Sequence, residues 1–148
     1  MQAGGSDFAT SKSGLSRERR RYHLEQILPA VLAEEKLEDP RWTSLAVVFS
    51  TTARGRNFGN SGYVYGDGDD WWPISFSVIE TKPPVVAFIR DTHGDIGDSL
   101  CRVLLQYDRK TRRALLSSEV GNPERWSITP DNARQLLVEL KPDFEALA

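Results

Sequence analysis

The residues best suited to acid–base chemistry are His93 and Asp95, which lie two positions apart in a predicted loop. A histidine beside a carboxylate can supply half of a general acid–base site. The other half would be a nucleophile or a bound metal, and no residue pattern in the sequence supplies one. The pattern therefore favours a solvated loop histidine. The chain is predicted to have no catalytic residues and not to be an enzyme.

A run of carboxylates at positions 67–70 (DGDD) could suit a hard cation such as calcium, which binds several carboxylate oxygens. The run leads directly into Trp71, however, and lacks the spaced ligands and terminal glutamate of an EF-hand. It is predicted to be a plain acidic turn, with no metal and no cofactor. The single cysteine, Cys101, excludes an intramolecular disulfide, and its predicted inward position on a strand argues against a catalytic thiolate.

The distribution of charge points to a binding surface. The 148-residue chain has a formal net charge of −2, yet positions 67–98 contain seven acidic residues against two basic ones, a local balance of −5. If the loops at 67–70 and 91–98 lie at the same end of the sheet, they form one negative patch. Carboxylates beside an aromatic anchor suit a surface that binds a cationic protein, and the alternative is ordinary solvated turns. The predicted partner-binding residues are Asp67, Asp69, Asp70, Trp71, Asp91, Asp95 and Asp98.

A hairpin over residues 61–79 is expected to position the first of these loops. In its second strand, alternate residues from Trp72 to Val78 are apolar, so they are expected to face the core. Trp71 then falls on the opposite face and is the better candidate for exposure. Pro73 indicates that this strand lies at or near an edge of the sheet.

Periodicity predicts helices at both ends of the chain and strands between them. A helix is predicted from Arg17, with an apolar stripe from Leu24 to Leu32 and a kink or restart at Pro29. A second helix is predicted to follow Thr129 as its N-cap. The predicted strands are Ser44–Thr51, the two strands of the 61–79 hairpin, Val85–Arg90, Ser99–Tyr107 and Arg113–Val120.

Consecutive strands joined by tight turns imply an α+β fold. We expect a largely antiparallel sheet of five to six strands, with an N-terminal and a C-terminal helix packed on one face. Residues 15–148 are predicted to form this single domain, and residues 1–14 a disordered tail. The small net charge argues against a nucleic-acid binder. No apolar run resembles a membrane span or signal peptide, so we expect no membrane partner and a cytoplasmic protein.

Four short motifs are spread over the chain: a helix ending in Ile27-Leu28-Pro29, the strand GYVY at 62–65 before a tryptophan, Tyr107-Asp108 at a hairpin turn, and the closing RWSITP at 125–130. Together, over about Leu24 to Phe144, they resemble the immunity proteins of bacterial polymorphic-toxin and contact-dependent inhibition systems, in particular the YezG-like group. The resemblance implies a small α+β protein that binds one cognate toxin domain and blocks it without catalysis. Partner surfaces diverge between such pairs, so the resemblance assigns no site residues.

Residues and resemblance together predict a non-catalytic immunity protein whose acidic edge meets a basic toxin domain, such as the phosphate-binding cleft of a nuclease. Two alternatives stay open. A secretion adaptor or chaperone for an effector would have an exposed apolar groove and form dimers. A small enzyme or ligand-binding domain would hold His93 and at least two carboxylates in one concave pocket.

Overall fold

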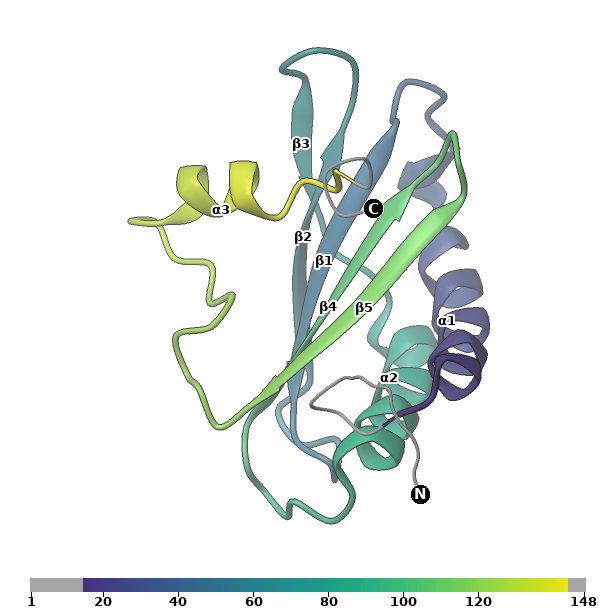
Figure 1. Cartoon of the computed structure of the whole chain (residues 1–148). Coiled ribbons are helices and arrows are strands. Elements are labelled where there is room, and N and C mark those ends of the chain that lie inside the picture. The colour runs from purple at the N-terminus through teal and green to yellow at the C-terminus, as the bar shows by residue number, and fades with distance from the viewer. Residues whose placement is uncertain (1–14, 144–148) are drawn as a thin grey trace.

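The computed structural model describes residues 15–143, so the tail expected at 1–14 lies outside the described residues. Five strands form one antiparallel sheet in the order β3-β2-β1-β4-β5 (Figure 1), which confirms the α+β prediction. None of the described helices is long and apolar enough to cross a membrane. The elements are α1 (Arg17–Leu32), the 3₁₀ helix η2 (Glu35–Glu38), β1 (Ser44–Thr51), β2 (Gly59–Tyr65), β3 (Trp71–Ile74), α2 (Val78–His93), β4 (Cys101–Asp108), β5 (Arg113–Val120) and α3 (Ala133–Glu139).

β1 is the central strand, in agreement with its apolar sequence on both faces. It pairs with β2 on one side and with β4 on the other, where the register runs from Ser44 opposite Asp108 to Thr51 opposite Cys101. β3 pairs only with β2, so Pro73 lies on an edge strand, as predicted, where a missing N–H is tolerated. β5 forms the other edge.

The two faces of the sheet are covered by different helices. α1 and α2 pack side by side on one face, and α3 lies over the other (Figure 1). The expectation that both terminal helices share one face is therefore wrong. Arg102 explains the difference, because alternation along β4 places it on the face away from α1. Its Nη1 donates to the carbonyl oxygens of Asn122 (3.3 Å), Pro123 (2.6 Å) and Arg125 (3.2 Å), which holds the segment after β5 on that face.

The main core lies between the sheet and the α1–α2 layer. Alternate residues of β4 from Cys101 to Tyr107 are buried there, which confirms the predicted inward face of that strand. Burial of large apolar side chains contributes about 1.5–3 kcal/mol each to folding. The largest fully buried side chains of this core include Phe49, Phe88, Ile27, Leu45, Ile89 and Leu105.

α2 is the largest departure from the expected fold. The sequence predicts a strand up to Ile79 and another over Val85–Arg90, whereas one helix spans both segments. Val78, expected in the core, is 45% exposed in the first turn of that helix. A capping signal was available, since the Ser77 hydroxyl accepts a hydrogen bond from Glu80 N at 3.3 Å, the S-x-x-E spacing of a capping box.

Two consecutive prolines make α2 hard to recognise, because each removes an N–H from the helix interior. The carbonyls that lose their donors belong to Ile79 and Glu80, and both residues are exposed, so water can replace the missing donors. The buried side chains also recur at helical rather than strand spacing. They are Thr81, Val85, Phe88, Ile89 and Thr92.

α1 begins where the sequence predicts. Ser16 caps it, accepting a hydrogen bond from Arg19 N at 3.1 Å. The helix continues through Pro29 to Leu32 without a restart. Leu32, expected in the buried stripe, is 37% exposed.

α3 begins at Ala133, later than predicted. Asn132 Oδ1 accepts a hydrogen bond from Thr129 N at 2.7 Å, and its Nδ2 donates to Ser127 O at 2.8 Å. These bonds hold a turn where the first helical turn was expected.

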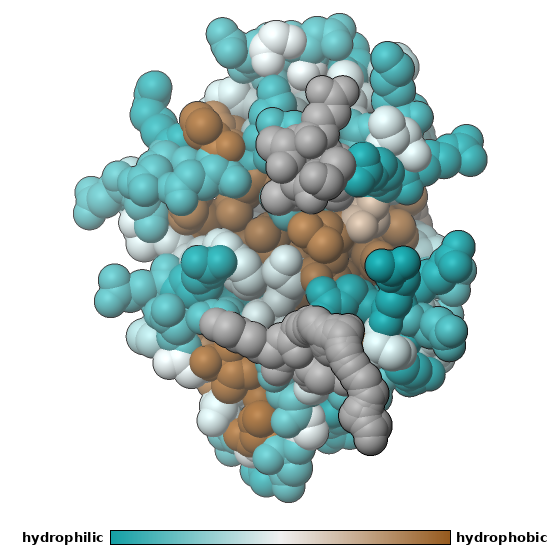
Figure 2. Space-filling model, in the orientation of Figure 1, coloured by the Kyte–Doolittle hydropathy of each residue, from teal (hydrophilic) through white to brown (hydrophobic). Residues whose placement is uncertain are grey.

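A smaller apolar cluster lies on the α3 side of the sheet. Figure 2 shows apolar residues in the middle of the view of Figure 1, with hydrophilic side chains around them. Beside this cluster, a cleft of ≈ 640 Å³ separates β4 and β5 from the C-terminal segment. The buried members of the cluster are Ala46, Val48, Tyr63, Tyr65, Leu104 and Leu140.

Side chains of the sheet hold α3 by its backbone. With seven residues, α3 is too short to be stable as an isolated helix. Its attachment therefore depends on hydrogen bonds from the sheet. Burial raises the pKa of the Tyr65 hydroxyl, which is one of the donors. The hydrogen bonds are Tyr63 Oη to Ala133 O (2.9 Å), Tyr65 Oη to Leu137 O (2.6 Å) and Gln106 Nε2 to Leu140 O (2.9 Å).

Removing the two hydroxyls should loosen α3 selectively. We expect Tyr63→Phe combined with Tyr65→Phe to cost about 2 kcal/mol, because each lost hydrogen bond contributes about 1 kcal/mol. Hydrogen exchange of the α3 amides should accelerate while β1 stays protected. Tyr107→Phe is the control, since no described acceptor bonds its hydroxyl. Uniform acceleration across the sheet would contradict a local role for the two tyrosines.

Candidate functional site

The β2–β3 turn brings its acidic residues and Trp71 together. Gly66 N donates to Asp70 O at 2.9 Å and Asp70 N donates to Asp67 O at 3.1 Å, which closes a tight turn. Asp67, Asp69 and Asp70 are exposed on it. Trp71 follows as the first residue of β3 and is 46% exposed, so its predicted exposure is confirmed.

Trp71 rests on a fixed support. Its ring packs edge-on against the ring of Tyr63, with the centroids 5.8 Å apart, and Tyr63 is buried and bonded to α3. Trp72 lies on the other face, where it is half-buried against the main core and the Arg41 guanidinium lies 5.5 Å from its ring centroid. The hairpin thus presents one tryptophan to solvent and packs the other against the core.

The turn carries negative charge that other residues do not offset. Among the described residues, no base lies within ion-pair distance of Asp67 or Asp69. The hydrogen bond to Asp39 raises the pKa of Arg41, and Asp70 adds a weaker contribution. Arg41 Nη2 lies 2.6 Å from Asp39 Oδ2, so this arginine is paired with Asp39 and interacts only weakly with Asp70.

The second predicted half of the site lies at the other end of the sheet. Tyr65, beside the turn, pairs with Ser44, whereas the loop at 94–100 leads into Cys101, which pairs with Thr51 (Figure 1). The eight residues of β1 separate these ends by about 25 Å. The expectation that the two loops lie side by side is wrong. α2 is the reason, because one helix takes the place of the predicted strand Val85–Arg90, and no strand among the described residues leads the chain back to the turn's end of the sheet before β4 begins.

Asp91 is paired with two basic side chains of α1. Its Oδ2 lies 2.7 Å from His23 Nε2 and 2.8 Å from Arg19 Nη2. The hydrogen bond from His23 and, to a lesser extent, that from Arg19 lower the pKa of the Asp91 carboxyl. Asp91 is therefore a structural link between α1 and α2.

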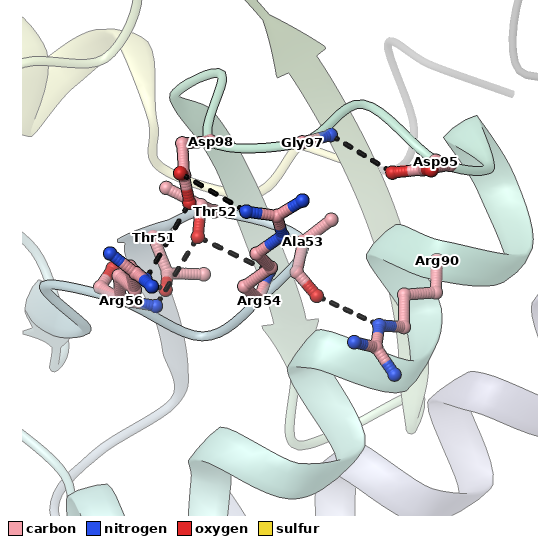
Figure 3. A network of polar contacts seen from close by, with 9 residues as sticks. All are labelled: Thr51, Thr52, Ala53, Arg54, Arg56, Arg90, Asp95, Gly97 and Asp98. Atoms are coloured by element: carbon pink, nitrogen blue, oxygen red, sulfur yellow. Dashed lines mark hydrogen bonds and ion pairs between the residues drawn. The ribbon is translucent and has the colours of Figure 1, made fainter.

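Asp98 and Asp95 lie on the loop after α2, facing an arginine-containing loop between β1 and β2 (Figure 3). Asp98 lies 3.4 Å from Arg54 Nη1 and 3.7 Å from Arg56 Nε. Asp95 Oδ1 accepts a hydrogen bond from Gly97 N at 3.2 Å. The local balance of −5 thus overstates the negative charge here, because it omits bases that other segments bring to these acids.

His93 is not the solvated loop histidine that the sequence favours, whereas Cys101 is buried as predicted. His93 ends α2, half-buried, with Nε2 2.8 Å from Ser118 Oγ, and burial lowers its pKa. Cys101 is fully buried, which raises the pKa of its thiol to about 11, so it is a thiol at neutral pH. Within residues 15–143, no three His, Cys, Asp or Glu side chains are grouped so that they could hold a metal ion.

Two features of these surfaces were missed from the sequence. His23 is only 2% exposed, and its position four residues before Ile27 and eight before Val31 is the signal that it shares their buried face. The second feature is the pairing of Arg54 and Arg56 with Asp98. It depends on long-range folding that no local pattern predicts.

The β2–β3 turn is the part of the predicted site that stays together as one exposed surface. It combines Trp71, supported by Tyr63, with the carboxylates of Asp67 and Asp69, which no base within residues 15–143 pairs with. The residues from Asp91 to Asp98 form a separate region with its own ion pairs. No family model, no curated protein and no solved structure matches the chain.

Proposed function

We propose that the chain is a non-catalytic immunity protein of a bacterial polymorphic-toxin or contact-dependent inhibition system. It binds and neutralises a cognate toxin domain in the cytoplasm, and its contact surface is the β2–β3 turn. The observation that carries the proposal is Trp71, 46% exposed and held by Tyr63, beside the unpaired carboxylates of Asp67 and Asp69. Asp91, Asp95 and Asp98 are not part of this surface, because Asp91 is paired within the α1–α2 layer and the other two lie on the loop at the opposite end of the sheet.

The two parts of this surface have different roles in binding. A tryptophan that loses its remaining exposure against a partner is the type of residue that dominates interface energetics. Carboxylates at the rim add little to affinity but steer a basic partner and raise its association rate. A basic toxin domain, such as a nuclease with a phosphate-binding cleft, has the complementary charge.

Truncation of the tryptophan should weaken the complex through its dissociation rate. We expect Trp71→Ala to raise the dissociation constant for the cognate toxin domain by about 30-fold, the effect of losing about 2 kcal/mol. Surface plasmon resonance with that domain measures it. Ile79→Ala is the control, because Ile79 is 84% exposed and apolar but lies on α2. An equal loss in both variants would place the contact elsewhere.

Reversing the charge of the three turn carboxylates should lower the association rate of the complex. We expect lysine at positions 67, 69 and 70 together to lower the association rate constant by at least about tenfold and to flatten its salt dependence. A variant with lysine at the exposed acids Glu25, Glu38 and Asp131 has the same net charge and should retain most of the rate. An association rate that depends only on net charge, and not on which acids are reversed, would refute steering by the turn.

A secretion adaptor or chaperone is the second candidate, and the outer side of the α1–α2 layer favours it. A groove of ≈ 460 Å³ runs between these helices, lined in part by Pro29, Pro83 and Pro84. The exposed side chains of Tyr22 (45%) and Ile79 (84%) also lie on this layer. An adaptor would bind an apolar effector segment here and form dimers. Light scattering that shows a monomer, together with an unchanged toxin complex in Ile79→Ser, would exclude it.

A further inference from the structure

The loop between β1 and β2 is a preorganised arginine-bearing loop. The Thr52 hydroxyl accepts hydrogen bonds from Arg54 N and Arg56 N, both at 3.2 Å, and Gly55 N donates to Thr52 O at 2.9 Å. Gly55 has φ +75°, and a Cβ there would lie 2.8 Å from Lys82 Cε. The lysine side chain could move aside, so the positive φ is what favours glycine here, and the bonds to Thr52 fix the backbone that carries both arginines.

Arg90 joins this loop from α2. Its Nε donates to the carbonyl oxygen of the buried Ala53 at 2.8 Å, which fixes the guanidinium (Figure 3). Arg54 and Arg90 line a cavity of ≈ 390 Å³ together with Ala53, Gly94 and Asp95. That volume lies in the range of small-molecule sites.

Positive charge exceeds negative charge around this cavity, since Arg54, Arg56 and Arg90 face the two carboxylates of Asp95 and Asp98. Arg54 Nη1 lies 3.4 Å from Asp98, compared with 2.6 Å for the pair of Arg41 and Asp39. Beyond Ala53 O, no described acceptor bonds the Arg90 guanidinium, although guanidinium has five N–H donors. The site therefore holds guanidinium donors suited to an oxyanion, and the bond to Ala53 O fixes that of Arg90.

We propose that this cavity binds a phosphate group, either as inorganic phosphate or as the phosphoryl group of a small molecule, with Arg54 and Arg90 as its donors. Phosphate above pH 7 is mainly a dianion, which the two guanidinium groups together can balance. Its binding would release Arg54 from Asp98. This site is about 25 Å from the β2–β3 turn and is independent of toxin binding.

Titration with sodium phosphate at pH 7.5 and constant ionic strength tests the proposal, followed by NMR of the glycine amides and arginine Nε groups. We expect saturable shifts at Gly55 and Gly94. Arg54→Gln should raise the dissociation constant about tenfold, because it removes a charge-assisted hydrogen bond. Asp98→Asn should lower it about threefold by freeing Arg54. Lys110→Gln, which removes a positive charge in the β4–β5 turn, should change it less than twofold.

Shifts that do not saturate, or equal weakening by Arg54→Gln and Lys110→Gln, would overturn the proposal and leave non-specific attraction. Unchanged binding in Asp98→Asn would also contradict it. A parallel titration with glycerol 3-phosphate distinguishes the two sources of the group. Tighter binding than inorganic phosphate supports a phosphorylated small molecule, and equal or weaker binding supports free phosphate.

Discussion

Replacing Gly62 with alanine is expected to destabilise the fold by about 3 kcal/mol, the upper range for an overpacked interior. Gly62 lies in β2, between Val47 of β1 and Ile74 of β3. A Cβ at this position would lie 2.5 Å from the backbone oxygen of Ala46 and 3.1 Å from Val47 Cα. Both atoms belong to the backbone of the central strand, so no side-chain rotation can relieve the contact. Urea denaturation measures the loss.

The same strand supplies a matched control. A Cβ at Gly59, three residues earlier in β2, would have no heavy atom within 4 Å. Gly59→Ala should therefore leave the free energy of unfolding within about 0.5 kcal/mol of the wild type, or raise it slightly by restricting the unfolded chain. Equal destabilisation by both substitutions would show that strand glycine content, and not the close approach of β1, determines the effect.

Replacing Asp91 with alanine is expected to cost about 3 kcal/mol at pH 7. The substitution removes the carboxylate that bonds His23 Nε2, and the other ring nitrogen, Nδ1, already has no described partner. The buried imidazole, packed against Phe88, would then lose its last hydrogen bond. Leaving a buried polar group unpaired costs about 1–3 kcal/mol, and the lost pair with Arg19 adds to it. Asp95→Ala, which affects only its own loop, should cost about 0.5 kcal/mol.

Acid should reduce the difference between wild type and Asp91→Ala. Because hydrogen bonds from His23 and Arg19 lower the pKa of Asp91 in the folded state, its contribution is fully present above the ordinary value of 3.8. It is lost as the pH falls through the lower folded value. Urea midpoints at pH 7 and pH 3 test this, and a difference that is the same at both pH values would contradict it.

Local patterns predicted the fold where one signal dominates. Ser16 capping, the apolar run of β1 and the alternation of β4 each specify an element without help from the rest of the chain. The prediction for the segment that forms α2 was wrong because two local signals conflict. Pro83-Pro84 normally ends a helix, and the helical spacing of the buried residues around them becomes decisive only when the sheet is present to pack against.

The candidate site was predictable only in part, for a related reason. Asp67, Asp69, Asp70 and Trp71 are adjacent in sequence, so a short turn keeps them together. Grouping them with Asp91 to Asp98 required knowing at which end of the sheet the second loop lies, and the unrecognised helix α2 reverses that answer. The charge balance counted along the sequence was also misleading for this loop, because basic side chains from distant segments pair with its acids. They are Arg19, His23, Arg54 and Arg56.

The way in which α3 is attached to the sheet has a consequence for how the outer side of this helix can evolve. The sheet holds this segment through hydrogen bonds to backbone carbonyl oxygens, which every amino acid provides. The donors are Tyr63, Tyr65 and Gln106. Substitutions on the outer side of α3, at Arg134 or Val138 for example, can therefore accumulate without detaching the helix. The outward side chains of α3 can diversify under selection while the hydrogen bonds that anchor the helix stay constant.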